Sequence, residues 1–398
     1  MDAAVDSGKC TTHQDCDDGL TCTTDTCKEG ACSHALQPNA CLIGKQCYAS
    51  GAAHPASPCH LCDPSHSTTS FKAVFCVSTL AGDGTSGYAN GPAVKAAFKS
   101  PWGLARHASG KVYVADGFNH VIRMVDSGLV STHAGTPQAA GHVNGPAAKA
   151  QFSYPTDVVV DAAGVVYVAD YGNHVVRVIK KGQVTTLAGD GKPGFADGTL
   201  LKARFNFPTG LALGSAGEVF VADTGNHRVR VIKKGQVTTL AGDGTTGLVN
   251  GVAAKARFHT PKAVAQGSGG VLYVADHGNH CVRVIKQGNV DTLAGDGKAG
   301  QVDGPAASAR FKYPHAVAVD SAGVVYVADR GNHSIRTITA GTVGTLAGSG
   351  AAGFADGPAL KAKFNAPTDV FVVGPNHLLV ADRVNSRLRI ASSPIPLP

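Results

Sequence analysis

One unit of about 53 residues recurs six times between residues 77 and 392 and dominates this sequence. The motif Val-Ala-Asp-x-x-Asn recurs at intervals of 54, 53, 53, 53 and 53 residues, with its aspartate at Asp116, Asp170, Asp223, Asp276, Asp329 and Asp382. A phenylalanine and a proline keep the same interval, from Phe98 to Phe364 and from Pro101 to Pro367. Repetition at this period indicates an array of equivalent modules that pack on one another.

Each unit is predicted to hold four short strands. In the third unit these are residues 209–213, 218–222, 227–232 and 236–241, and each run ends in a turn rich in Gly, Asn or Asp. Apolar, β-branched runs between such turns are typical of strands. Because the runs are apolar throughout, the sheets should be buried on both faces, as in a radial array of sheets. The connection between units is predicted to contain a short Ala-rich helix.

The two ends of the repeat array complement each other. Residues 77–82 (VSTLAG) match the fourth-strand sequence VTTLAG at 237–242, yet they precede the first complete unit. The last unit stops after its third strand, at residues 388–391. We therefore predict an all-β fold, a six-bladed β-propeller closed by an N-terminal strand in the last blade. An open solenoid, the alternative, would not need that strand.

Two segments carry a resemblance to a known family. Residues 167–177 (YVADYGNHVVR) and 221–230 (VADTGNHRVR) resemble NHL repeats, and the resemblance extends over six copies. The sixth copy departs from the pattern, since Ser386 stands where the other copies have His. The resemblance implies a propeller of a class whose members often bind protein, glycan or RNA. Other relatives in this class are lyases and lactonases that hold a metal in the central channel.

Ten of the eleven cysteines lie between residues 10 and 76. A dense, even-numbered set in a short stretch is typical of a disulfide framework in an oxidising compartment. A zinc module is the alternative, because Cys59 and Cys62 form a C-x2-C pair, but no second pair accompanies them. The spacing leaves the pairing open. The disulfide candidates are Cys10, Cys16, Cys22, Cys27, Cys32, Cys41, Cys47, Cys59, Cys62 and Cys76.

We place a Cys-rich, disulfide-stapled module at residues 1–70 and the propeller at residues 71–398. Residues 16–32 are similar to Cys-rich segments of secreted bacterial proteins of myxobacterial type. No apolar run approaches the ~20 residues that a membrane span needs. The start of the chain does not read as a signal peptide, so we expect that a leader was removed or is not included. The predicted location is secreted, cell-surface or periplasmic.

Residues shared by every unit are predicted to be scaffold. In the third unit, Asp223 should accept hydrogen bonds from a turn, Asn226 should be left-handed, and Arg230 should pair with a carboxylate. Neighbouring copies of the histidine that follows this Asn should lie on the order of 10 Å apart, because the second strand stands outside the innermost one. Zinc needs donors about 2 Å from one ion, so this ring is predicted to pack turns and not to bind metal. Its members are His120, His174, His227, His280 and His333.

Positions that differ between units are the candidates for a ligand site. Innermost strands alone can converge on the axis, and the residues just after each unit's proline vary. The candidates there are Trp102, Asp157, Lys262, His315 and Asp369. The turns between the motif's Asp and Asn also vary, which adds Phe118, Tyr171, His277, Arg330 and Arg383. Aromatic and basic groups on one face suit recognition of an acidic partner. The alternative is a solvated channel whose polar residues have drifted.

The function predicted from the sequence is a binding scaffold. It recognises a protein or an anionic glycan through the face that bears the interblade loops and the turns between second and third strands. An oxidising compartment disfavours nucleic acid as the partner, and we expect a monomer. The alternative is a metal-dependent lyase or lactonase-like hydrolase with Ca²⁺ or Zn²⁺ in the channel. No catalytic residue, metal ligand or cofactor is assigned, because neither His-Glu-x-x-His nor Gly-x-Ser-x-Gly occurs.

Overall fold

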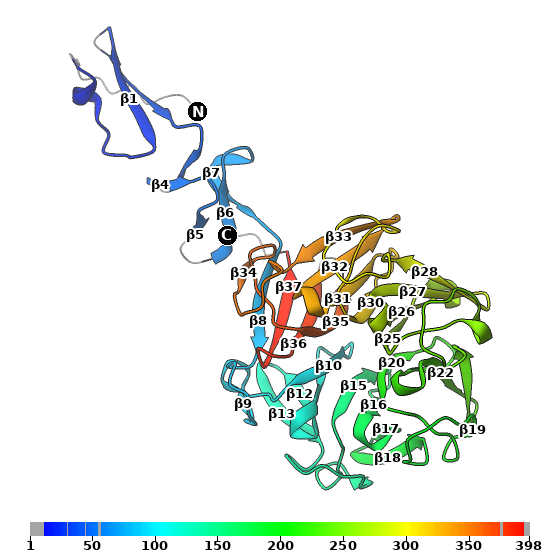
Figure 1. The fold of residues 1–398 in the computed structure, drawn as a ribbon. Helices are drawn as coiled ribbons and strands as arrows, with labels where there is room; N and C mark the ends of the chain where they lie inside the picture. The colour runs from blue at the N-terminus through cyan, green and yellow to red at the C-terminus, as the bar shows by residue number, and fades with distance from the viewer. Residues whose placement is uncertain (1–11, 30, 44, 55–56, 375–376, 394–398) are drawn as a thin grey trace. The chain divides into compact units, whose positions relative to one another are not determined.

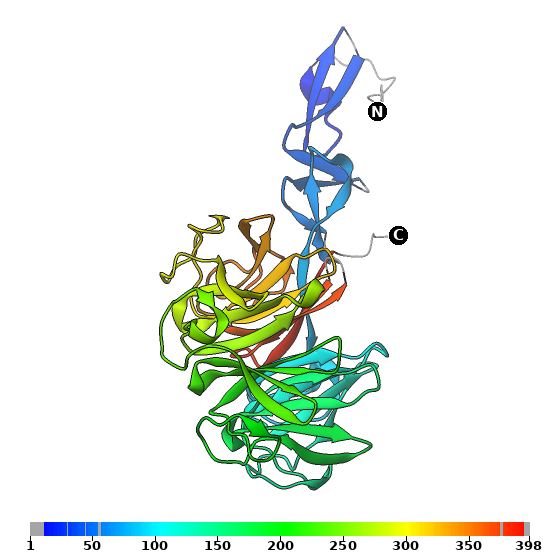
Figure 2. The same cartoon turned by 90° about the vertical axis from the view of Figure 1, so that its right-hand side faces the viewer.

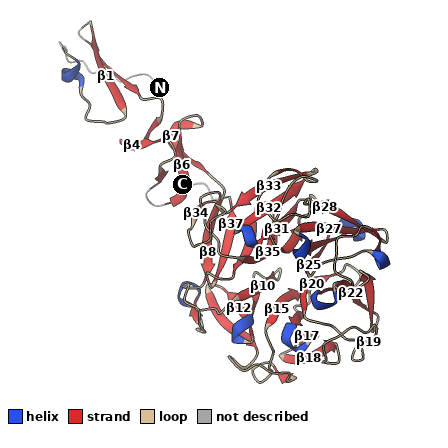
Figure 3. Cartoon of the chain, in the orientation of Figure 1, coloured by secondary structure: helices blue, strands red, loops and turns tan. Residues whose placement is uncertain are grey.

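Short strands make up most of the computed structural model, which describes residues 12–29, 31–43, 45–54, 57–374 and 377–393 (Figure 3). The described chain divides into two units. The first comprises residues up to Cys76 together with Ser393, and the second is Val77–Ser392. Within the described residues, no helix is long and apolar enough to cross a membrane.

The first unit is a set of small strand pairs joined by disulfides. Its elements are η1 (His13–Cys16), β1 (Thr23–Lys28), β2 (Ala31–Leu36), β3 (Ala40–Ile43), β4 (Gln46–Ala49), β5 (Ala53–His54), β6 (Ser57–Asp63) and β7 (Ser67–Ala73). Strands β1 and β2 pair, β3 and β4 pair, and β5, β6 and β7 form a three-stranded sheet.

Disulfides hold these small sheets together. The bonds join Cys16 to Cys32, Cys22 to Cys47, Cys41 to Cys62, and Cys59 to Cys76. Cys27 is also disulfide-bonded, and Cys10 lies outside the described residues. The disulfide prediction is therefore confirmed for the described candidates, and the zinc alternative is wrong because Cys59 and Cys62 belong to two different disulfides.

The described part of the second unit contains six five-stranded sheets, arranged around a central axis in Figure 1. The innermost strands are β10 (Pro101–Arg106), β15 (Pro155–Val160), β20 (Pro208–Leu213), β25 (Pro261–Gln266), β30 (Pro314–Val319) and β35 (Pro367–Gly374). The second strands are β11 (Val112–Asp116), β16 (Val166–Asp170), β21 (Val219–Asp223), β26 (Leu272–Asp276), β31 (Val325–Asp329) and β36 (His377–Asp382). The third are β12 (Val121–Asp126), β17 (Val175–Lys180), β22 (Arg228–Lys233), β27 (Cys281–Lys286), β32 (Ser334–Thr339) and β37 (Arg387–Ser392).

The fourth strands are β13 (Leu129–Ala134), β18 (Gln183–Ala188), β23 (Gln236–Ala241), β28 (Asn289–Ala294), β33 (Thr342–Ala347) and, in the sixth sheet, β8 (Cys76–Ala81). A fifth, two-residue strand that the sequence did not predict lies outermost in each sheet. These strands are β9 (Gly91–Pro92), β14 (Gly145–Pro146), β19 (Gly198–Thr199), β24 (Gly251–Val252), β29 (Gly304–Pro305) and β34 (Gly357–Pro358). Strands β9, β14, β19, β24 and β29 make two register pairs each, for example Gly198 with Val237 and Thr199 with Gln236.

The predicted Ala-rich helix is shorter than expected. It is a single 3-10 turn at η2 (Ala93–Lys95) and η6 (Ala253–Lys255), and hydrogen-bonded turns replace it in the other sheets. Further 3-10 turns join the second and third strands at η3 (Gly117–Asn119), η4 (Tyr171–Asn173), η5 (Thr224–Asn226), η8 (His277–Asn279) and η9 (Arg330–Asn332), and η7 (Ser268–Gly270) precedes β26. Figure 2 turns the unit by 90° and displays the edges of the sheets.

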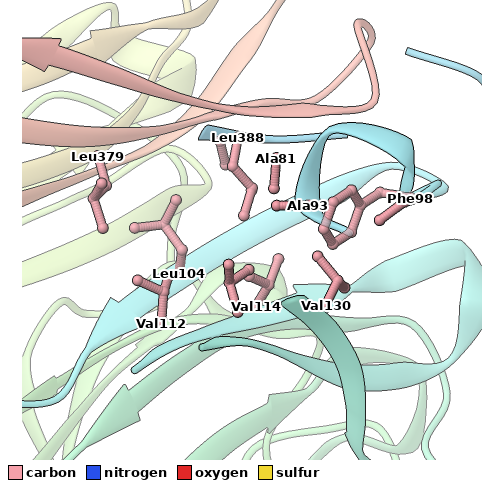
Figure 4. Close-up of a cluster of buried hydrophobic side chains, with 12 residues drawn as sticks. Ala81, Ala93, Phe98, Leu104, Val112, Val114, Val130, Leu379 and Leu388 are labelled. Carbon is pink, nitrogen blue, oxygen red and sulfur yellow. The ribbon is translucent and has the colours of Figure 1, made fainter. Parts of the chain in front are cut away.

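The first and sixth sheets pack against each other. The sixth sheet has the order β34-β8-β37-β36-β35. Strand β8, whose sequence matches the fourth strands of the other sheets, therefore lies between β34 and β37. A buried cluster joins Ala81 and Leu388 of this sheet to Phe98, Leu104 and Val114 near or in the first (Figure 4). The backbone N–H of Leu104 also donates to Asp369 Oδ2 at 2.7 Å. The two ends of the repeat array therefore meet in one interface.

A buried aspartate–arginine pair stabilises the interior of every sheet. In the third sheet, Asp223 Oδ1 accepts from the Asn206 N–H at 2.8 Å, and its Oδ2 accepts from Asn226 at 2.8 Å and from Arg230 at 2.7 Å. Both side chains of the ion pair are fully buried. Burial raises the pKa of the equivalent Asp116 to about 6, which leaves that pair ionised at neutral pH. These hydrogen bonds agree with the predicted scaffold role of the shared aspartate and arginine.

The left-handed residue is the histidine in the first five turns and Ser386 in the sixth, and the expectation for Asn226 was wrong. His227 has φ 54°, whereas Asn226 ends a 3-10 turn. The Asn226 side chain donates to Asp223 Oδ2 and to the Gly194 carbonyl. The histidine Nδ1 accepts from a backbone N–H of the next sheet, as His227 does from Thr260 at 3.1 Å. Residues such as Thr260 also have positive φ, although each precedes a proline, so the imidazole holds a strained position.

Candidate functional site

The innermost strands all begin at one end of the central channel, and their first side chains are tied to the neighbouring strand. Thr156 Oγ1 donates to the Thr209 carbonyl at 3.0 Å, and Thr209 Oγ1 donates to the Lys262 carbonyl at 2.8 Å. His315 Nδ1 lies 2.7 Å from the Thr368 carbonyl, and Thr368 Oγ1 donates to the Trp102 carbonyl at 2.8 Å. These bonds fix the residues that follow each proline.

One residue further along, the channel is at its narrowest. A Cβ on Gly103 would lie 2.7 Å from the Asp157 Cα, and one on Gly210 would lie 2.6 Å from the Ala263 Cα. The space left at this level is about 20 Å³. Only residues with small or tangentially directed side chains fit here, which accounts for the Gly and Ala at these positions. The constriction separates two wider spaces, one at each end of the innermost strands.

The wider space at the start of the strands is an aromatic pocket of about 230 Å³, which we call the mouth pocket. Its lining is Trp102, Phe118, Tyr154, Thr156, Tyr171, Thr209 and Lys262. Phe118 and Tyr154 meet edge to face with centroids 5.4 Å apart, and Tyr171 stacks on Phe207 at 4.6 Å. Four rings and one ammonium group therefore surround a space sized for a single ring of a ligand.

Lys262, Arg330 and Arg383 gather around this pocket, and none of them forms an ion pair with an acidic side chain in the part of the chain that the structure describes. The Arg383 guanidinium lies 4.2 Å from the Trp102 ring centroid and donates from Nε to Ser100 Oγ at 2.6 Å. Burial and then Arg330 lower the pKa of Arg383 to about 10, and the same two causes lower the pKa of Lys262 to about 8. Burial also lowers the pKa of Arg330. The charged groups that act on Lys262 and Arg383 are thus other cations.

Two histidines, His315 and His277, lie between the rings of Trp102 and Tyr313. The His315 ring lies 5.3 Å from Trp102 and 5.9 Å from His277, and His277 lies 5.1 Å from Tyr313. Burial and then Lys262 lower the pKa of His277 to about 3. Burial, His277 and Lys262 lower the pKa of His315 well below its ordinary value. These lowered pKa values favour the neutral form of both rings.

Asp157 and Asp369 lie deeper in the channel than the other candidates, away from the mouth pocket. They line the constriction and a second space of about 280 Å³ that is walled by apolar residues of the later parts of the innermost strands. Asp157 Oδ2 accepts from the Leu211 N–H at 2.7 Å, just as Asp369 Oδ2 accepts from Leu104. Burial and then the Asp369 charge raise the pKa of Asp157 well above its ordinary value, and burial raises that of Asp369 to about 7.

The candidates in the channel do not form a group of three potential metal ligands among the described residues. Among the described residues, the one group of three potential ligands within 4.8 Å of one another is Asp18, Asp25 and His34, in the first unit. Asp157, His315 and Asp369 do not form such a group, and the histidines of the turns are occupied by backbone N–H groups. Arg204 and Arg257, in the connections between sheets, pair with Asp190 and Asp243.

The raised pKa of Asp369 predicts how stability depends on pH. Asp369 holds its proton more tightly in the folded chain than in the unfolded chain. Between the two pKa values, the unfolded state therefore binds fewer protons than the folded state. Stability should therefore fall between about pH 4, near the ordinary value, and the folded-state pKa of about 7. Asp369→Asn should flatten this slope in urea unfolding curves taken across the interval. Asp291→Asn, on the exposed face of β28, is the control, and equal slopes in both variants would contradict the assignment.

Sequence reasoning missed Tyr154 and Phe207. Both stand directly before the proline of an innermost strand, at φ 49° and 54°, which turns their rings toward the mouth. The signal was present, because this position varies from Ser100 to Ala366 between units while the proline that follows it does not. Cys281 is fully buried and forms no disulfide, and burial raises the pKa of its thiol.

The repeats match a known family. Residues 152–179, 205–232, 258–285 and 311–338 match the NHL repeat. Four of the six repeats are therefore similar to NHL repeats. NHL repeat-containing protein 2 of Bos taurus is 32% identical over 286 residues, covering 61% of this chain and 39% of that protein. Protein SUPPRESSOR OF QUENCHING 1, chloroplastic, of Arabidopsis thaliana is 30% identical over 281 residues, covering 65% of this chain and 27% of that protein.

This chain spans about two fifths or less of the length of these two longer proteins. A solved auxiliary nutrient binding protein from Bacteroides thetaiotaomicron has a TM-score of 0.62 at 16% identity, covering 93% of this chain and 88% of that one. At this identity the likeness concerns the fold. Together the NHL repeats and this neighbour support an NHL-repeat propeller.

Proposed function

We propose that this chain is a secreted or surface binding protein whose six sheets close into a propeller and recognise an anionic ligand at the mouth pocket. The observation that carries the proposal is the set of three cations, Lys262, Arg330 and Arg383, around an aromatic pocket without a described acidic partner. Partly buried like charges raise the free energy of the empty site, and an anion would relieve that cost. The disulfides fit an extracellular or periplasmic location.

The geometry favours an acidic glycan over a flat protein surface. A pocket of about 230 Å³ accepts one ring, and standard protein–protein contacts are much broader than such a pocket. Trp102, Phe118 and Tyr171 offer apolar faces against which a sugar ring can pack, while the basic groups attract its acid. The ligand thus combines a ring with a negative charge.

Removing the Lys262 charge should weaken anion binding by about tenfold, since a hydrogen bond to a charged group contributes roughly 1.5–3 kcal/mol and solvent access reduces this value. The chain has one tryptophan, Trp102, which lines the pocket, so its fluorescence reports binding at this site directly. The measurement is a fluorescence titration of wild type and Lys262→Met with D-glucuronate, which carries one carboxylate on a sugar ring.

Lys180→Met is the matched control, because this lysine is exposed at the end of β17, away from the mouth. It should bind D-glucuronate as the wild type does. If Lys262→Met and wild type bind this probe equally well, or if no anion perturbs Trp102 in the wild type, the mouth pocket is not an anion site.

A further inference from the structure

Two buried polar atoms at the mouth lack a hydrogen-bond partner. Among the described residues, the other buried side-chain atoms of this kind belong to strands and turns of the repeated scaffold, at Asn119, Arg123, Arg177, Arg283 and Ser334. The other two are His315 Nε2, whose residue lines the constriction next to the mouth pocket, and Arg330 Nε, in the turn η9 after β31. Leaving a buried polar atom unpaired costs roughly 1–3 kcal/mol, so a ligand that pairs both atoms would gain from each.

The hydrogen bonds of His315 decide which role its free nitrogen has. A carbonyl oxygen can only accept, so the short contact with the Thr368 carbonyl places the ring proton on Nδ1. Nε2 then carries a lone pair. His315 is 8% exposed and lies among Lys262, Arg330 and His277, which disfavour a second proton. His315 Nε2 is therefore a fixed hydrogen-bond acceptor inside a cationic site.

The free atom of Arg330 has the opposite character. Its Nε–H is a donor, it carries positive charge, and its charge acts on Lys262, His315 and Arg383. The mouth thus offers a charged donor and a neutral acceptor as neighbours. Sulfate can satisfy the donor but has no proton for the acceptor, and a neutral sugar can satisfy the acceptor without balancing the charge. A ligand that bears both a carboxylate and a hydroxyl group matches both atoms.

We propose that the ligand of the mouth pocket is a hydroxy-carboxylate of the sugar-acid class. Its carboxylate binds Arg330 and Lys262, and one hydroxyl donates to His315 Nε2. The body of its ring packs against Trp102, whose centroid lies 5.3 Å from that of His315. This inference rests on the proposed function, because it specifies the anion for the same site.

The test compares two acids of similar shape on the full chain, with Trp102 fluorescence as the readout. D-glucuronate has the carboxylate and the hydroxyl groups, whereas cyclohexanecarboxylate has the carboxylate on a ring without hydroxyl groups. Wild type should bind D-glucuronate about tenfold more tightly, the effect of one hydrogen bond to a buried acceptor. D-glucose and sulfate should each bind more weakly than D-glucuronate.

His315→Phe removes the acceptor but keeps a ring between Trp102 and His277. It should abolish the preference for D-glucuronate while leaving cyclohexanecarboxylate binding near the wild-type value. His107→Phe, on the turn after β10, is the control and should keep the preference. Equal binding of the two acids by wild type would overturn this inference and leave the anion site standing. Failure of every anion to bind would overturn the proposed function as well, and both comparisons on wild type hold even if His315→Phe fails to fold.

Discussion

Replacing Arg283 by Met is expected to lower the free energy of unfolding by about 3–5 kcal/mol, because it leaves the Asp276 carboxylate buried without its counter-ion. Arg283 donates to Asp276 Oδ2 at 2.9 Å, to the Arg257 and Val249 carbonyls at 2.9 Å each, and to Asn250 at 2.6 Å. Both side chains of the ion pair are 0% exposed. Urea unfolding of wild type and variant measures the change.

The same sheet supplies a matched comparison at the surface. Arg257 Nε lies 2.9 Å from Asp243 Oδ2, but these side chains are 44% and 26% exposed. Exposed pairs of this kind contribute about 0–1 kcal/mol, so Arg257→Met should change stability little. Similar losses in the two variants would show that burial of the pair is not what stabilises the sheet.

Ala81→Asp is expected to cost at least about 3 kcal/mol and to loosen the interface between the first and sixth sheets. Ala81 is 0% exposed on β8 and belongs to the cluster that includes Leu388 and Phe98 (Figure 4). A carboxylate at this position would lie among apolar side chains that offer no hydrogen bond. Thermal unfolding and proteolysis both measure the effect.

Ser78→Asp is the control on the same strand, because Ser78 is exposed. Surface substitutions usually stay within about 0.5 kcal/mol of the wild type. A harmless Ala81→Asp would mean that β8 does not contribute to the sixth sheet in solution, and the proposal of a closed ring would fall with it.

The periodicity of the sequence predicted the strands well because each apolar run ends at a Gly, Asn or Asp turn. The predicted run 236–241 is β23 itself, and the other three strands of the third sheet shift by one residue. The fifth strand was missed because Gly198–Thr199 has no apolar signal, and its two residues are held by pairing with β23 alone. Local propensity says nothing about such a strand.

The candidate site was predicted in part. Ordering by repeat position grouped Trp102, Phe118, Tyr171 and Lys262, and these four residues line one pocket. Their role in binding a ligand stays a prediction. Repeat position did not separate Asp369 from Lys262, because the two occupy successive positions after the proline. The β-bulge after each proline turns their side chains toward different ends of the channel. Nor did repeat position find the free nitrogen of His315, which depends on a bond to a neighbouring sheet.

The polar interior of each sheet is completed over short stretches of chain. Arg230 reaches Asp223, the Arg204 carbonyl and the Ala196 carbonyl, all within 34 residues. No residue of the mouth takes part in these bonds. Because the forces that hold a sheet and the groups that meet a ligand occupy separate positions of the same repeat, the binding specificity of this architecture can diverge by point substitution while its folding stability is conserved.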